Sequence, residues 1–180
     1  MSLPFSDPAL IIAGSAALVW VSRKALARPR SHGYYRFFAA ESILLLLVLN
    51  RNPVGGQTVA QILLAVSAAL LVLGYSALRL FGNARPSRAD DALLGFERTT
   101  TLVTGSIFRY IRHPMYASLI ALAWAFFFRD PSLLAGVLAA VGSVLLFLTA
   151  RADERECLAY FGELYADYMQ RTRRFVPYLF

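Results

Sequence analysis

The chain has 180 residues, a net charge of +7 and 58% hydrophobic residues, and its mean hydropathy is +0.54. This composition is far more apolar than that of a water-soluble domain, so we expect lipid to surround most of the chain. The length suits one compact unit, 1–180. The single cysteine, Cys157, excludes an internal disulfide, is expected to be a small apolar filler, and leaves no metal site predicted. The basic residues gather in particular loops, which indicates membrane topology and not a nucleic-acid-binding surface.

Five apolar segments have the lengths of membrane helices, and the sequence therefore predicts an all-α integral membrane protein. They run over 8–21, 35–49, 58–81, 115–128 and 132–150. The first, second and fourth are shorter than the roughly 20 residues that a crossing needs, and flanking aromatic and arginine side chains extend them into the interface. Three spans then occupy 1–81, and the rest of the chain, 82–180, holds a long loop, a helical hairpin and a C-terminal helix. No basic start of a secretory signal precedes the first span, so we expect none.

The distribution of basic residues predicts the orientation. Only Arg51 and Arg129 lie on one side of the predicted spans, whereas the other side carries most of the arginines. These are Arg23, Lys24, Arg28, Arg30 and Arg36, then Arg79, Arg85, Arg88, Arg98, Arg109 and Arg112, and finally Arg151, Arg155, Arg171, Arg173 and Arg174. The positive-inside rule places the N-terminus outside and the C-terminus in the cytoplasm.

Two ionisable clusters lie at the same end of neighbouring spans. The first reads F-R-Y-I-R-H-P-M-Y over 108–116, and the second reads R-A-D-E-R-E over 151–156. The turn at 129–131 makes spans four and five an antiparallel hairpin, with Pro131 expected to open the second helix. Since Pro114 suits a first helical turn, His113 should lie just outside a helix start, where unpaired backbone N–H groups favour an acceptor. The alternative is that these residues are ordinary interfacial anchors.

The region after span five is predicted to continue as a helix into the cytoplasm and to break at 161–162. Asp153 and Glu154 are either solvated partners of nearby arginines or inward-facing groups that hold a cationic ligand or sugar hydroxyls. The basic and aromatic tail, 171–180, suits anionic headgroups. Apolar residues in the long loop, 82–106, argue against disorder. Glu41, inside span two, is either functional or paired with Arg36 or another boundary arginine.

Together these clusters resemble the isoprenylcysteine carboxyl methyltransferase family, integral membrane enzymes that use S-adenosylmethionine and are related to the phospholipid N-methyltransferases. The resemblance covers about 80 residues in order and includes no part of the first three spans. It rests on Leu102-Val103, Arg112-His113-Pro114-Met115-Tyr116, Asp153-Glu154, Leu158, Phe161-Gly162, Tyr165, Tyr168 and Pro177.

The resemblance implies a bacterial inner-membrane methyltransferase that binds S-adenosylmethionine on the cytoplasmic side and releases S-adenosylhomocysteine. The implied cofactor-binding residues are Thr100, Thr101, Leu102, Val103, Phe108, His113, Pro114, Met115, Tyr116, Asp153 and Glu154. The implied catalytic residues are Arg112, His113, Arg151 and Glu154. The acceptor would be a lipophilic small molecule or a lipidated group that enters from the membrane lipid, with a carboxylate as the family's example.

Three departures from the family pattern concern the acceptor more than the donor. Thr100 replaces a histidine and Ser118 replaces a glycine. The acidic pair is Asp-Glu instead of Glu-Glu, and Arg151 near it stands in for a carboxylate-binding arginine whose usual place Thr149 occupies. Methyl transfer to a carboxylate or thiolate depends on positioning and exclusion of water and needs no strong base, whereas an amine acceptor would need Glu154 or His113 to take a proton. The alternatives are a phospholipid or a small amine or thiol as acceptor, or a non-enzymatic membrane transport or assembly protein.

Overall fold

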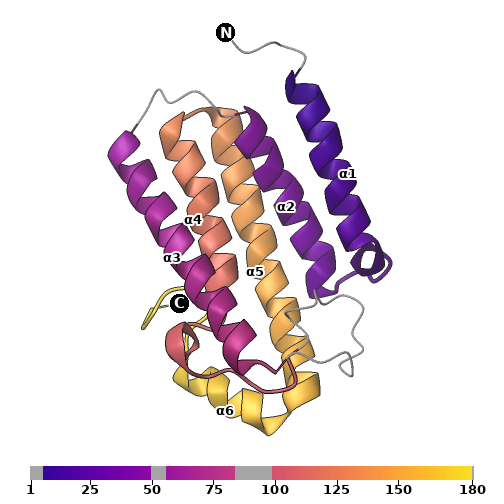
Figure 1. The fold of residues 1–180 in the computed structure, drawn as a ribbon, viewed down its shortest axis with the longest axis vertical. Helices are drawn as coiled ribbons and strands as arrows, with labels where there is room; N and C mark the ends of the chain where they lie inside the picture. The colour runs from indigo at the N-terminus through magenta and orange to yellow at the C-terminus, as the bar shows by residue number, and fades with distance from the viewer. Residues whose placement is uncertain (1–5, 50–55, 84–98, 180) are drawn as a thin grey trace.

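The computed structural model describes residues 6–49, 56–83 and 99–179. Within these ranges, five long helices stand side by side, and a short sixth helix crosses one end of the bundle (Figure 1). The helices are α1 (Ser6–Leu26), α2 (His32–Leu49), α3 (Gln57–Phe81), α4 (Pro114–Arg129), α5 (Leu133–Phe161) and α6 (Glu163–Arg171), with a 3₁₀ turn, η2 (Ser106–Arg109), before α4.

The prediction of an all-α membrane protein is confirmed. Over the described residues, α1 from Pro8 onward, α2, α3 and α5 are each long and apolar enough to cross a membrane. The fourth predicted span, α4, has 16 residues and is a shorter apolar helix. The last helix of the hairpin, α5, has 29 residues, more than the roughly 20 that a crossing needs, so its acidic cluster can stand beyond the hydrocarbon.

The helices lie next to one another in the order α1, α2, α5, α4 and α3. Small residues stand at two of the contacts between them. A Cβ atom on Gly74 of α3 would lie 3.0 Å from side-chain atoms of Pro114 and Met115, so these two helices touch through the glycine. Ser42 of α2 donates a hydrogen bond to the Leu138 carbonyl oxygen of α5 at 2.8 Å. Small residues permit this approach where lipid supplies no hydrophobic drive between helices.

The hairpin positions the two ionisable clusters. Pro114 is in the first turn of α4 as predicted, and His113 precedes it. The prediction that Pro131 opens α5 is wrong, because Ser132 is the N-cap and its side chain accepts a hydrogen bond from the Ala135 N–H at 3.1 Å. A serine oxygen satisfies a free N–H of the first turn, which proline cannot do.

Several predictions fall outside the described residues. The loop residues expected to be ordered, Leu93, Leu94 and Phe96, belong to this group, as do four of the arginines used for orientation, Arg51, Arg85, Arg88 and Arg98.

Glu41 lies between two helices of the bundle. Its Oε2 accepts a hydrogen bond from the Ser15 hydroxyl of α1 at 2.8 Å. Hydrogen bonds of this kind hold membrane helices together. Glu41 therefore links α1 to α2, away from the ionisable clusters at the bundle end.

Candidate active site

A cavity opens where α3, α4, the end of α5, α6 and the 99–113 segment meet. The space between its lining residues is about 720 Å³, and part of it is open to solvent. Most of its lining is aromatic or apolar, with a few ionisable side chains. The lining residues are Leu78, Thr99, Leu102, Val103, Phe108, Arg112, His113, Pro114, Met115, Tyr116, Asp153, Cys157, Phe161, Tyr165 and Tyr168.

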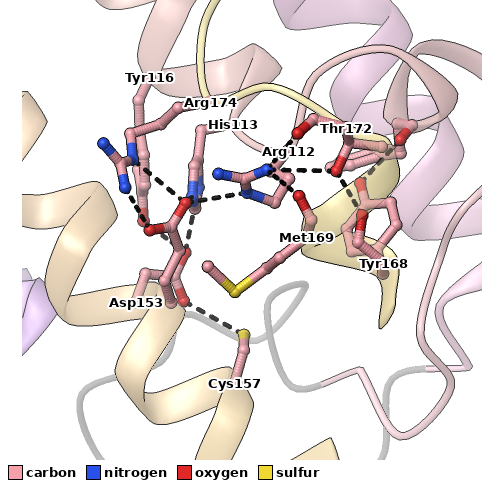
Figure 2. Close-up of polar contacts among 11 residues, drawn as sticks. Arg112, His113, Tyr116, Asp153, Cys157, Tyr168, Met169, Thr172 and Arg174 are labelled. Carbon is pink, nitrogen blue, oxygen red and sulfur yellow. Dashed lines mark hydrogen bonds and ion pairs between the residues drawn. The ribbon is translucent and has the colours of Figure 1, made fainter. Parts of the chain in front are cut away.

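A polar network lies behind this cavity (Figure 2). Glu154 is its centre, because Arg112, His113 and Arg174 all contact its carboxylate. Its carboxylate is buried and accepts hydrogen bonds from Arg112 Nε at 2.9 Å and from Arg174 Nη2 at 2.7 Å. His113 Nε2 lies 3.3 Å from the same carboxylate. Charge-assisted bonds to two guanidinium groups are among the strongest polar contacts in proteins, so Glu154 fixes the positions of Arg112 and His113.

The C-terminal tail completes the network. The Arg112 and His113 N–H groups donate to the carbonyl oxygens of Arg173 and Arg174 at 2.8 and 3.1 Å. The part of the tail at 172–174 also pairs with the loop before α4, and its predicted contact with headgroups stays a prediction. Arg174 was assigned only a topological role from the sequence, and nothing in its local pattern indicated that it pairs with an acid 20 residues earlier.

Asp153, next to Glu154 in sequence, faces the cavity. Its Oδ2 accepts a hydrogen bond from the Tyr116 hydroxyl at 3.3 Å and lies 3.6 Å from His113 Nδ1. The His113 ring stacks on the Tyr116 ring with centroids 5.3 Å apart. The Asp153 side chain is 22% exposed, against 5% for Glu154. Asp153 is therefore the acid that remains accessible to a ligand.

The structure brings together most of the residues predicted for the site. Nine of them line the cavity: Leu102, Val103, Phe108, Arg112, His113, Pro114, Met115, Tyr116 and Asp153. Glu154 lies behind the lining and supports it. Thr100 and Thr101 are not among the lining residues; their N–H groups donate to the Gly82 carbonyl oxygen at 3.1 and 3.2 Å and close the turn after α3. Arg151 is exposed on α5 and is also absent from the described lining.

Other lining residues were not predicted as site residues. Cys157 and Phe161 follow Asp153 at intervals of four, which places all three on one face of α5. Tyr165 and Tyr168 of α6 close the cavity from below, and burial raises the pKa of both phenols above the usual value. The pattern F-G-x-x-Y-x-x-Y could have identified Phe161, Tyr165 and Tyr168 as site residues. No sequence pattern pointed to Thr99. Cys157 lies in the site, not in an apolar core as expected, and its Sγ is 3.6 Å from Asp153 Oδ1.

The arrangement suits positioning chemistry. Among the described residues, no group of three or more histidine, cysteine, aspartate or glutamate side chains is placed to hold a metal ion. The Arg112 guanidinium is held by Glu154 and by the carbonyl oxygens of Met169 and Thr172 (Figure 2). Asp153 and the surrounding aromatic rings are left to contact a ligand, and a carboxylate among aromatic faces favours a cation.

These features define an integral membrane protein with a small-molecule site at one end of its bundle. The family model described as phospholipid methyltransferase matches residues 57–167, from α3 into α6. This match covers more than half of the chain and includes every lining residue except Tyr168. The chain therefore belongs to the phospholipid methyltransferase family, which confirms the resemblance to integral membrane methyltransferases.

A curated relative gives a second comparison. Methanethiol S-methyltransferase 1 of Bradyrhizobium diazoefficiens is 29% identical over 168 residues, which cover 85% of this chain and 56% of the relative. The chain thus spans a little over half the length of the relative that it matches. No solved structure matches the chain.

Proposed function

We propose that this protein is an integral membrane methyltransferase that transfers a methyl group from S-adenosylmethionine to a small lipophilic thiol. The observation that carries the proposal is the convergence of Asp153, His113 and Tyr116 in an aromatic-lined cavity. It occurs in a chain whose family is named for methyl transfer.

The residues of the cavity fit the donor. The sulfonium and ammonium groups of S-adenosylmethionine are cations, and the accessible Asp153 carboxylate beside Tyr116 and Tyr165 suits a cation. Leu102, Val103 and Phe108 offer the apolar surface that an adenine ring needs, as the family resemblance implies. Thr100, Thr101 and Glu154 would act on the donor only through the residues that they position.

The chain's own contribution is to orient and enclose the reactants. When bound, S-adenosylmethionine supplies an electrophilic methyl carbon. The acceptor sulfur forms a bond to this carbon while the bond between the carbon and the sulfonium sulfur breaks, which leaves S-adenosylhomocysteine. The thiol proton passes to solvent. Glu154 fixes Arg112 and His113, and His113 and Tyr116 in turn hold Asp153. Such fixed placement and exclusion of water account for most of the barrier lowering that a displacement needs.

The choice of a thiol follows from the charges of the cavity. A carboxylate acceptor needs a cationic partner, but Arg112, which alone among arginines lines the described cavity, is held by Glu154. Arg151, the residue expected to bind a carboxylate, is exposed outside the lining. A thiol requires no cation, and the relative is named as an enzyme acting on methanethiol. The family's name favours a phospholipid amine as the second candidate, with Asp153 as the proton acceptor.

The proposed location is a bacterial inner membrane, with the N-terminus outside and the cavity open to the cytoplasm. Its support is the basic residues near the cavity end of the described helices, such as Arg23 and Lys24 in the last turn of α1 and Arg79 in that of α3. Donor from the cytoplasm and acceptor from the bilayer could then reach one site.

The test is an assay of the purified protein with methyl-tritiated S-adenosylmethionine. Methanethiol, phosphatidylethanolamine and a prenylated cysteine carboxylate are offered separately. We expect a volatile labelled thioether with methanethiol, and loss of that product in Asp153→Asn. Label in phospholipid instead would favour the second candidate, and label in no acceptor would contradict the proposal.

A further inference from the structure

We propose that Leu78 of α3 and Met115 of α4 form the wall of the cavity toward the bilayer, and that their side chains limit the acceptor to a short alkyl chain. This inference rests on the proposed function, because it names the part of the same cavity that the acceptor occupies. Both residues would select the acceptor by its size.

The origin of the lining residues separates the polar and membrane sides of the cavity. Asp153 and Cys157 come from the last turns of α5, and Tyr165 from α6 below the bundle. Leu78 and the first turn of α4 come from helices that pack side by side within the bundle (Figure 1). The seam between α3 and α4 is therefore the side on which a lipophilic molecule would approach from lipid.

The exposure of neighbouring residues indicates which face of α3 meets lipid. On this helix Leu80 is 74% exposed and Leu73 is 46% exposed, as expected for a lipid-facing surface. Leu78 and Met115 are each half-buried and line the cavity. Trimming either side chain would enlarge the cavity at the seam between α3 and α4.

One turn above Leu78, the seam is closed. Gly74 lies so near α4 that an added Cβ would be 3.0 Å from the Met115 and Pro114 side chains. The cavity thus cannot extend along the seam toward the middle of the bundle unless these side chains move. A short acceptor fits between Leu78, Met115 and the reacting centre near Asp153, whereas each further methylene has to displace the wall.

The consequence is a steep dependence of rate on acceptor length. One extra methylene in a tight apolar pocket changes kcat/KM by about 10–200-fold. Replacing Leu78 or Met115 with alanine creates room for two or three carbons and should flatten this dependence. Leu78 is not among the residues implied to bind the donor, so Leu78→Ala should keep its affinity for the donor product. Met115 is among those residues, so Met115→Ala is read only through its dependence on acceptor length.

The experiment compares kcat/KM for methanethiol, ethanethiol, butanethiol and hexanethiol in wild type, Leu78→Ala, Met115→Ala and Leu80→Ala. We expect the ratio of butanethiol to methanethiol to rise about tenfold or more in the two wall variants and to stay at the wild-type value in Leu80→Ala. Calorimetric titration with S-adenosylhomocysteine, with equal affinity in wild type, Leu78→Ala and Leu80→Ala, shows that the donor side is intact. Leu78→Val and Met115→Val give the same direction with smaller change if an alanine variant does not fold.

Wild-type length profiles in both wall variants, with normal product affinity, would overturn the inference and leave the proposed function standing. If thiols are not methylated but another acceptor class is, the same length series is run in that class. If no acceptor is methylated, the proposed function fails, and alkylation of Cys157 by N-alkylmaleimides of increasing chain length still tests the wall. Leu78→Ala must then speed the long reagents relative to the short ones, and equal ratios would overturn the inference.

Discussion

At the scale of residues, the two adjacent acids of α5 divide the work between structure and ligand. Glu154 is buried and bonded to Arg112, Arg174 and His113, whereas the Asp153 side chain is partly exposed in the cavity. The sequence predicted that the pair matters but treated both acids as ligand groups. The difference depends on Arg174, whose approach from the tail no local pattern indicates.

This division predicts different outcomes for two conservative substitutions. Glu154→Gln leaves two guanidinium groups without their carboxylate and should lower the free energy of unfolding by about 3 kcal/mol, the cost of breaking a buried ion pair. Asp153→Asn should leave stability unchanged and weaken binding of S-adenosylhomocysteine about tenfold or more, because a charged contact is lost. Thermal unfolding and calorimetry in the same detergent measure both. Equal destabilisation by the two substitutions would contradict the assignment.

Tyr165 predicts how stability responds to alkaline pH. Burial raises the pKa of its phenol in the folded protein, so the folded state keeps the proton that the unfolded chain loses near pH 10. Because the folded state then binds more protons, stability is full below pH 10 and falls as the pH rises above it. Tyr165→Phe should reduce this alkaline loss in thermal unfolding at pH 8 and 10.5. Tyr110→Phe, at a 43% exposed position, is the control and should leave the alkaline loss of stability unchanged.

At the scale of elements, the sequence predicted all five long helices because apolar runs of sufficient length are a strong signal. The ends of the helices were less well predicted. The first helix, α1, extends over Ser6–Leu26, whereas the sequence predicted 8–21. Helical hydrogen bonding continues through polar residues that a hydropathy criterion does not count. The break at Gly162 was predicted, and its φ of 58° explains it, because glycine adopts this left-handed region readily.

The contact between α3 and α4 gives a prediction at this scale. Gly74→Ala places a methyl group 3.0 Å from side-chain atoms of Pro114 and Met115, so these side chains must shift by a few tenths of an ångström. We expect a loss of stability of about 1–3 kcal/mol, as for overpacked cores. Gly142→Ala is the matched control, since its methyl group would meet Ile43 and Ser42 at ordinary contact distances of 3.7 Å or more. Equal thermal unfolding of the two variants would show that α3 and α4 do not pack this closely.

At the scale of the whole molecule, the sequence placed the histidine–proline cluster and the acid pair at one end of the bundle. The His113 to Glu154 distance of 3.3 Å confirms that they meet. Which residues of the two clusters face the cavity and which lie behind it could not be predicted. This arrangement depends on α6 and on a tail that folds back over 110–113. The acceptor side could not be predicted either, since Leu78 has no motif and is recognised only by its place beside α4.

The orientation remains a prediction of the charge pattern. A reporter enzyme that is active only outside the cytoplasm should be active when fused before Ser6 and inactive when fused after the C-terminus, in a bacterial host. A fluorescent protein that folds in the cytoplasm should give the reverse pattern. Activity of the external reporter at the C-terminus would place the cavity on the other side of the membrane.

The central claim is that this cavity binds S-adenosylmethionine, and the chain's single cysteine allows a direct test because Cys157 lies in the lining. The measurement is the rate of Cys157 alkylation by a maleimide with and without S-adenosylhomocysteine. At about ten times the dissociation constant, an occupied cavity should slow the reaction about tenfold. An unchanged rate at millimolar S-adenosylhomocysteine would contradict the account.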